Sequence, residues 1–375
     1  MDLGLSDDQE LFRDTTSRFL ADTCPLSVVR SLEDDPTGFD RDWWRQGAEL
    51  GWTSMLAPET SGGGSISGNG LHDLALIAFE RGRSVSPGPL VPTNTAVAVL
   101  TGAGAGDAHQ ELVAGLIAGD EIVTLALDEP GRAWGVRGIT AQLRGRDGGF
   151  IVDGHKSPVE AGAQASAHLV SCRDETGEPV LVLVPASANG VGVRPRATVD
   201  LVRRYAAVDF DGVEVDEAAV VARGAIAIDR CLDIANVVQL AETLGAIDRV
   251  FEFTLEWAFD RHTFGRPLAS YQELKHRFAD MKLWLEASKA TVGAAIRGAG
   301  EGRPDASELV STAKSYVSQY APELVQDCVQ IHGGIGVTWD HDIHLYLRRV
   351  TLNSLTYGTA RDHRERLAAM ILDGG

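Results

Sequence analysis

The hydrophobic pattern of the chain changes its period twice, and this change limits the folds that the sequence can adopt. Between about residues 122 and 221, apolar residues fall in short runs separated by turn residues, which is typical of β-strands. Before and after this region, apolar residues recur at helical spacing. The β-type runs are IVTLAL (122–127), GFIVDG (149–154), HLVSC (168–172), VLVLVP (180–185) and YAAVDFDGVEV (205–215). We therefore expect an α+β chain of three domains: an N-terminal helical domain (1–118), a central β-barrel or sandwich domain (119–224) and a C-terminal four-helix bundle (225–375).

Caps and breakers mark the helical segments. Ser6 and Gln9 have the spacing of a capping box at the start of the first helix. The proline-rich SPGPLVPT is expected to interrupt the helical pattern before residue 94. The spacing of apolar residues predicts further N-terminal helices at 43–50, 71–83, 94–100 and 108–118, and C-terminal helices at 234–260, 271–299, 308–331, 344–352 and 360–371.

Composition excludes several classes of protein. The net charge of −19 argues against binding to nucleic acid or to an anionic membrane surface. No run of about 18 apolar residues indicates a membrane span, and the acidic start MDLGLSDDQELF lacks the apolar segment of a signal peptide. The four cysteines form no CxxC pair, and His341 and His344 have no evident third ligand, so we expect no disulfide framework and no metal site. We expect a cytoplasmic protein.

Two glycine-containing motifs lie in the predicted bundle. The first is RHTFGRPL (261–268), which, taken alone, indicates a helix end, because glycine and proline stop helices. The second is QIHGGIG (330–336), at the end of the third long helix. Together these motifs resemble those of the acyl-CoA dehydrogenase family, and the similarity runs over essentially the whole chain. The stretches PETSGGG, FERGRSVSPGPLVPT and GGIGVTWDHDIHLYLRR resemble the branch found in actinobacterial sterol and steroid breakdown.

The resemblance implies an FAD that lies between the β domain and the bundle and reaches into a neighbouring subunit. The neighbour supplies the arginine and the Q-x-x-G-G turn to the ADP half of the cofactor. Arginine suits pyrophosphate, because it makes charge-assisted hydrogen bonds, and glycine lets the backbone approach a ligand closely. The positions that match the family's cofactor contacts are Arg261, Thr263, Phe264, Leu268, Gln272, Gln330, Gly333 and Gly334.

The sequence departs from the family at the flavin ring. The family has a T-E-P-G-A-G-S-D-type loop whose polar groups bind the ring, and here the stretch is LALDEPGRAWGV, with Ala133 and Trp134 in place of small polar residues. The family also has a W-I-[TS] strand after a G-x-K turn. Here Pro158 enters that strand, where it removes a hydrogen-bond donor, and Glu160 brings a negative charge. We therefore expect that this chain does not hold a flavin ring of its own.

The sequence also departs from the family at the catalytic base, a carboxylate that removes the α-proton of a CoA thioester. Tyr357 stands in TYGT where the family has glutamate, and the alternative family position, near the start of the long helix, is Ala235. Tyrosine is a poor base because its ordinary pKa is about 10. Glu242 lies two turns after Ala235 on a similar face and is a candidate for a relocated base, while Asp233 lies on a different face. The alternative for Glu242 is a solvated or hydrogen-bonded helix residue.

These features lead to one main hypothesis and two alternatives. The main hypothesis is the non-catalytic subunit of an FAD-dependent acyl-CoA dehydrogenase that desaturates a CoA thioester, for instance one derived from a sterol. It would share an FAD with a homologous subunit in an α2β2 complex, with an electron-transferring flavoprotein as the expected electron acceptor. The first alternative is an active homomeric dehydrogenase that uses Glu242, and the second is a scaffolding subunit without enzymatic activity.

Overall fold

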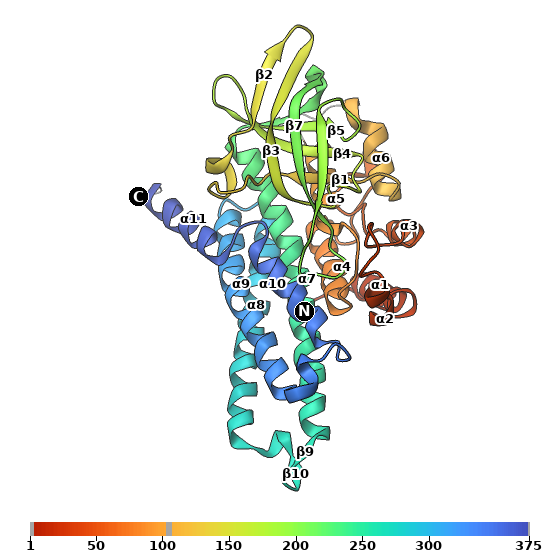
Figure 1. Cartoon of the computed structure of the whole chain (residues 1–375), viewed down its shortest axis with the longest axis vertical. Helices are drawn as coiled ribbons and strands as arrows, with labels where there is room; N and C mark the ends of the chain where they lie inside the picture. Colours follow the sequence, from red (N-terminus) through yellow and green to blue (C-terminus); the bar gives the residue numbers. More distant parts are fainter. Residues whose placement is uncertain (1–3, 103–106, 374–375) are drawn as a thin grey trace.

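The computed structural model describes residues 4–102 and 107–373, and its N-terminal region is helical. Short helices lie beside the upper half of the long helix α7 (Figure 1). The Ser6–Gln9 capping box is confirmed at the start of α1. The helix predicted at 94–100 begins earlier, at Leu90, because Pro92 falls in the first turn, where a missing N–H costs no hydrogen bond. The helices are α1 (Asp7–Thr23), α2 (Leu26–Ser31), α3 (Arg41–Glu49), α4 (Gly70–Arg83), α5 (Leu90–Leu100) and α6 (Gln110–Ala118).

The central region is one mixed sheet of eight strands, at the top of Figure 1. Its order is β6-β7-β3-β2-β4-β5-β8, with β1 paired to β4, so the described strands form no closed barrel and the barrel or sandwich expectation is corrected to this open sheet. The strands are β1 (Val123–Ala126), β2 (Gln142–Arg146), β3 (Gly149–Glu160), β4 (Ala167–Arg173), β5 (Pro179–Pro185), β6 (Val191–Arg196), β7 (Tyr205–Val215) and β8 (Val220–Arg223). Pro158 lies inside β3, where the pairing with β7 shifts register between Lys156 and Val159, and this irregularity accommodates a residue without an N–H.

The C-terminal region is a bundle of long helices that runs down from the sheet (Figure 1). The first long helix begins at Ala225 rather than at residue 234, because the sequence AIAIDRCLD continues the helical pattern toward the sheet. The helix α11 extends away from the bundle toward the C-terminus. The bundle elements are α7 (Ala225–Asp260), α8 (Gln272–Gly300), α9 (Ala306–His332), α10 (Ile343–Leu355) and α11 (Ala360–Asp373).

Two apolar cores hold these regions together. The larger core contains residues from the N-terminal helices, the sheet and the bundle, and the smaller core lies within the sheet. The division into domains 1–118, 119–224 and 225–375 therefore stays a prediction, because the larger core is shared among all three.

Candidate functional site

The RHTFGRPL motif forms a β-hairpin at the far end of the bundle. The strands β9 (His262–Thr263) and β10 (Arg266–Pro267) pair antiparallel, and Phe264 and Gly265 form the two-residue turn. Both turn residues have positive φ, +48° and +80°, as a type I′ hairpin turn requires. The Arg266 guanidinium lies 3.9 Å from the centre of the Tyr271 ring. The Tyr271 hydroxyl donates a hydrogen bond to the carbonyl of Thr263 over 2.8 Å. Tyr271, which follows the hairpin in the sequence, therefore holds both of its strands in place.

Phe264 stands at the tip of this hairpin and is 99% exposed. A bulky aromatic residue is rarely found with positive φ and costs conformational energy there. Full exposure offers no packing within the chain to offset that cost. The ring of Phe264 is therefore free of packing within this chain and is accessible to a partner molecule.

The QIHGGIG motif forms the exposed end of α9. Gln330 and Gly333 are exposed, and so is Gly334. Gly333 has φ 66° and ψ −140°, a conformation open almost only to glycine. A Cβ atom added at either glycine would meet no other atom of the described chain within 4 Å. Gly334 is thus not required by packing within this chain, and its backbone is open to approach by a ligand.

Trp257 and His332 bring the two motifs together. The Arg261 guanidinium lies 5.8 Å from the centre of the Trp257 ring. The Trp257 ring in turn stacks on His332 with centroids 5.3 Å apart and planes at 18°. Because His332 directly precedes Gly333, the arginine and the glycine turn belong to one surface region, although about seventy residues separate them. Sequence reasoning missed both rings, since neither motif contains Trp257 and a histidine before a glycine turn carries no distinctive signal.

The other predicted cofactor positions lie near the hairpin. Thr263 is half-buried in β9, and Leu268 is half-buried after β10, where its N–H donates to the carbonyl of Arg261 over 2.8 Å. Gln272 is exposed at the start of α8 and bonds to His276 over 2.8 Å. Their contacts with a cofactor stay predictions.

The loop that resembles the family's flavin loop is held by ion pairing within the chain. The Glu129 carboxylate pairs with the buried Lys156 ammonium over 2.7 Å and accepts the N–H groups of Thr140 and Ala141. Burial raises the pKa of Glu129, but Lys156 and the hydrogen bonds outweigh this effect, so the pKa of Glu129 is lowered. Burial also lowers the pKa of Lys156, and the charge of Glu129 opposes that effect. Trp134 packs against His363 of α11 with ring centroids 4.4 Å apart. The loop thus faces its own C-terminal helix.

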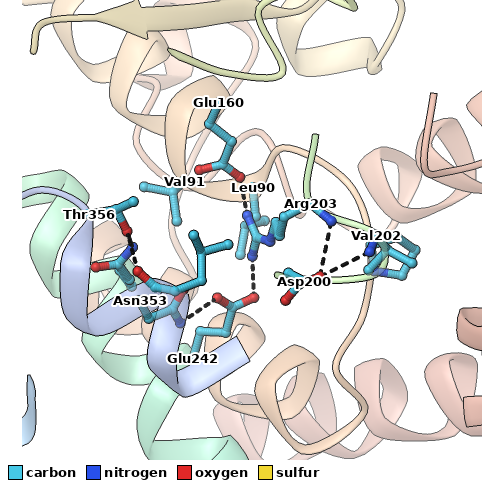
Figure 2. A network of polar contacts seen from close by, with 12 residues as sticks. Leu90, Val91, Glu160, Asp200, Val202, Arg203, Glu242, Asn353 and Thr356 are labelled. Atoms are coloured by element: carbon cyan, nitrogen blue, oxygen red, sulfur yellow. Dashed lines mark hydrogen bonds and ion pairs between the residues drawn. The ribbon is translucent and has the colours of Figure 1, made fainter. Parts of the chain in front are cut away.

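A buried network of ion pairs lies between β3 and α7 (Figure 2). The Arg203 guanidinium pairs with the carboxylates of Glu160 and Glu242 at the same time. Glu242 also accepts from Arg349 over 3.0 Å and from the Asn353 amide over 3.2 Å. Every one of these five side chains is at most 5% exposed. The charge that Glu160 brings into the site is therefore neutralised from within the chain.

Glu242, the candidate for a relocated base, is held as an anion in this network. Burial raises its pKa, but Arg203, Arg349 and then Arg81 outweigh that effect and lower it. A carboxylate with a lowered pKa and two guanidinium partners is a weak proton acceptor. Asp233, the second carboxylate considered, pairs with Arg366 over 2.6 Å and accepts the hydroxyl of Ser307.

Neither of the two positions that hold the catalytic base in the family carries a carboxylate in this chain. Ala235 is fully buried, and Tyr357 is 8% exposed with φ 56°. The Tyr357 hydroxyl donates to Glu160 over 3.3 Å. Burial, followed by the charge of Glu160, raises the pKa of this hydroxyl well above its ordinary value, so it stays protonated.

The cavity beside Glu160 and Tyr357 is very small. A cavity of about 10 Å³ lies among Leu125, Leu127, Asp128, Pro158, Glu160, Tyr205, Thr356 and Tyr357. Such a volume is close to the minimum that one water molecule needs. The lining includes Pro158, Glu160 and Tyr357, which stand at positions that the resemblance assigns to the flavin ring and the base, and this cavity is too small for a flavin ring.

Two family models match the chain, one over each helical region. The N-terminal domain of acyl-CoA dehydrogenase matches residues 6–120, and the C-terminal domain of acyl-CoA dehydrogenase matches residues 222–372. The chain belongs to the acyl-CoA dehydrogenase family, whose members are oxidoreductases acting on CH–CH bonds and use FAD.

Within this family, three similar proteins match the chain over nearly its whole length. Acyl-CoA dehydrogenase IpdE2 of Mycolicibacterium smegmatis is 27% identical over 369 residues, which cover 98% of this chain and 100% of that protein. The ChsE4–ChsE5 complex of Mycobacterium tuberculosis contains a chain that is 26% identical, with a TM-score of 0.90 and coverage of 100% and 99%. A variant of the Tcur3481–Tcur3483 steroid ACAD is 28% identical, with a TM-score of 0.87 and coverage of 98% of each chain. These similarities support the steroid-degradation branch that the motifs indicate.

Neither a membrane-spanning helix nor a metal-binding cluster is found in the described part of the chain. Among residues 4–102 and 107–373, no helix combines the length and the apolar character needed to cross a membrane. In the same ranges, no group of three or more histidine, cysteine, aspartate or glutamate side chains is arranged to hold a metal ion.

Proposed function

We propose that this chain is the non-catalytic subunit of a heteromeric acyl-CoA dehydrogenase. It contributes contacts to the ADP half of an FAD whose flavin ring is held by a homologous partner subunit. The partner carries the catalytic glutamate and the polar loop that this chain lacks. The complex then desaturates a CoA thioester between its α and β carbons.

The asymmetry between the two halves of the cofactor site is the observation that carries this proposal. Arg261, Phe264, Gln330, Gly333 and Gly334 are exposed at the end of the bundle. The positions for the flavin ring are instead closed by side chains of the chain itself, with about 10 Å³ left between them. The residues proposed to act on a neighbour's cofactor are thus accessible, while Glu160 and Tyr357, at the flavin-ring and base positions, are buried and hydrogen-bonded to each other.

Each exposed residue has a role suited to the ADP half of FAD. Arg261 binds pyrophosphate oxygens through charge-assisted hydrogen bonds. Phe264 packs against a flat ring system, and the Gly333–Gly334 backbone approaches the ligand without obstruction from a Cβ atom. When bound, FAD supplies the oxidising chemistry, since the flavin ring accepts the hydride from the β carbon.

The similar proteins extend the proposal to partner and substrate. Two of the solved relatives are complexes or paired assemblies, ChsE4–ChsE5 and the Tcur3481–Tcur3483 steroid ACAD. We therefore propose a homologous acyl-CoA dehydrogenase subunit as partner in an α2β2 assembly, and a sterol- or steroid-derived CoA thioester as substrate. An electron-transferring flavoprotein is the proposed electron acceptor, and the cytoplasm is the proposed location.

Purification of the chain alone and together with its homologous partner tests this proposal. The lone chain is expected to show no visible flavin absorption and no oxidation of acyl-CoA, and the complex is expected to show both. Arg261→Ala is expected to lower the FAD content of the complex, measured by flavin absorption. The subunits are expected to stay associated, which light scattering verifies. A lone chain that purifies yellow and oxidises acyl-CoA would contradict the proposal.

The two alternatives give different results in the same experiments. An active homomer that uses Glu242 would lose turnover and keep its flavin in Glu242→Gln, but the lowered pKa of Glu242 disfavours this role. A purely scaffolding subunit would leave the FAD content unchanged in Arg261→Ala. An unchanged FAD content in Arg261→Ala would contradict the shared cofactor site. It would not affect the assignment of the chain to the acyl-CoA dehydrogenase family.

A further inference from the structure

We propose that Trp257 and His332 are positioning residues for the shared cofactor site. Their stacked rings fix the position of Arg261 relative to the Gly333–Gly334 turn, so that both motifs meet the same dinucleotide of the partner. This inference rests on the function proposed above and concerns how the two motifs act as one site.

The two motifs need such a connection because they come from different helices. Arg261 ends α7, whereas Gly333 follows α9. A displacement of one helix end relative to the other would separate the guanidinium from the glycine turn. Productive contacts tolerate only small errors in position, so a site built from two helix ends depends on what joins them.

Trp257 supports Arg261 from one turn earlier on α7. The backbone N–H of Arg261 donates to the carbonyl of Trp257 over 2.8 Å, which closes the last turn of the helix. The Arg261 guanidinium then lies over the indole ring at 5.8 Å, within the range of a cation–π interaction. The indole N–H is buried and has no hydrogen-bond partner among the described residues. The ring is thus held by contacts to its carbon framework, chiefly the stack on His332.

His332 fixes the other end of the stack. Its Nδ1 lies 2.9 Å from the carbonyl of Cys328, and since a carbonyl only accepts, Nδ1 carries the proton. The ring also meets Phe253 and His341 at centroid distances of 5.7 Å and 4.5 Å. The His332 ring has little freedom to rotate, because it is hydrogen-bonded and packs against three other rings. The orientation of His332 therefore determines where Trp257 lies and where Gly333 leaves the helix.

Holding Arg261 in place before binding has a direct benefit for affinity. A free arginine side chain loses rotamer freedom when it binds a phosphate, which weakens binding. The indole surface limits that freedom in advance. Trp257 is thus expected to strengthen cofactor binding only through Arg261.

A double-mutant cycle on the complex with the partner subunit tests this dependence. FAD is titrated into the deflavinated complex for the native pair, Arg261→Ala, Trp257→Leu and the combination of both. Each single substitution is expected to weaken FAD binding about tenfold. The combination is expected to bind about as weakly as Arg261→Ala alone, because Trp257 has nothing to position once the guanidinium is gone. Light scattering verifies that each complex stays assembled.

A matched control removes a similar stack elsewhere in the bundle. Trp284 of α8 stacks on Tyr320 of α9 with centroids 5.5 Å apart and planes at 28°. Trp284→Leu therefore deletes the same kind of contact, and we expect it to leave FAD affinity unchanged. Trp257→Phe keeps an aromatic face and is therefore expected to retain part of the FAD affinity that Trp257→Leu loses. It replaces Trp257→Leu in the cycle if the complex with Trp257→Leu does not assemble.

The outcomes separate this inference from the function on which it rests. If Arg261→Ala does not change FAD affinity, the shared cofactor site itself is wrong. If Arg261→Ala weakens binding but Trp257→Leu and Trp257→Phe do not, only the positioning role is overturned. Effects that multiply in the double variant, to about a hundredfold, would also overturn it, because they would show that the two residues act independently.

Discussion

A single guanidinium, that of Arg203, joins two segments that are eighty residues apart. It pairs with Glu160 at the end of β3 and with Glu242 in the middle of α7. Around this centre, Arg349 pairs with Asp200 over 2.5 Å and with Glu242 over 3.0 Å. All these groups are buried, so each charge depends on its partners rather than on water. Through Glu160, the network reaches the small cavity at the positions that the resemblance assigns to the flavin ring.

Removal of Arg203 is therefore expected to destabilise the fold strongly. Arg203→Met keeps much of the volume but leaves two buried carboxylates without their shared cation. Breaking a buried pair in this way costs about 3–5 kcal/mol of unfolding free energy. Urea unfolding followed by circular dichroism measures the change.

The control for Arg203 is an arginine in an exposed pair. Arg361 bonds to Glu365 over 2.8 Å, with 84% of the arginine side chain exposed. Arg361→Met is expected to leave the unfolding curve unchanged, because solvent already screens this pair. If Arg203→Met unfolds at the same urea concentration as Arg361→Met, the network does not have the structural role assigned to it.

At the scale of elements, strand β4 combines a central position with a buried histidine. β4 lies between β5 and the pair β1 and β2, and six of its seven residues are buried. His168 is the second residue of this strand and is fully buried, and neither ring nitrogen has a hydrogen-bond partner among the described residues. Burial alone lowers its pKa from 6.5 to about 4. The strand thus holds a neutral imidazole.

The buried His168 makes the free energy of unfolding depend on pH below about 6.5. In the unfolded chain His168 takes up a proton below its ordinary pKa of 6.5, whereas in the folded chain it does so only near pH 4. Its neutral form is therefore compatible with the fold above pH 6.5, and stability is lost as the pH falls from about 6.5 toward 4. The loss amounts to something on the order of 3 kcal/mol. Unfolding free energies measured across this range are expected to fall less steeply in His168→Leu.

An exposed histidine provides the comparison for His168. His276 lies on the surface of α8, and His276→Leu is expected to leave the acid dependence as it is in the native chain. A His168→Leu protein with the full acid loss of the native chain would show that other groups cause it.

At the scale of the whole molecule, the residues proposed for a partner's cofactor are exposed, and the positions proposed for a flavin ring of the chain itself are closed around a small cavity. The long helices carry the exposed motifs to the end opposite the sheet, as Figure 1 shows. The closed site lies where the sheet meets α7 and α10. An assembly of this chain with a complete partner should therefore hold fewer flavins than chains.

The ratio of flavin to protein in the complex measures this prediction. For an α2β2 assembly we expect half as many FAD molecules as chains, because only the partner holds flavin rings. Native mass spectrometry gives the assembly, and flavin absorption after denaturation gives the cofactor content. One FAD per chain would contradict the closed site described above.

Local sequence patterns predict much of this architecture. Capping residues, apolar spacing and glycine stops depend on nearby residues, and they locate most helices and strands, including YAAVDFDGVEV as the whole of β7. They fail where two local rules compete. A proline such as Pro92 indicates a break in a helix, but it is tolerated in the first turn of α5. The long helix α7 begins at Ala225 rather than at residue 234.

What the sequence by itself determined is therefore the order of the elements, the two cofactor motifs and the absence of glutamate at 235 and 357. Only the tertiary structure decided the environment of the candidate residues. The sequence leaves Glu242 open between a base and a solvated or hydrogen-bonded helix residue, and the structure shows it hydrogen-bonded and buried between Arg203 and Arg349. The physical reason is that these charges come from separate strands, loops and helices, and an ion pair between distant segments exists only after the chain has packed.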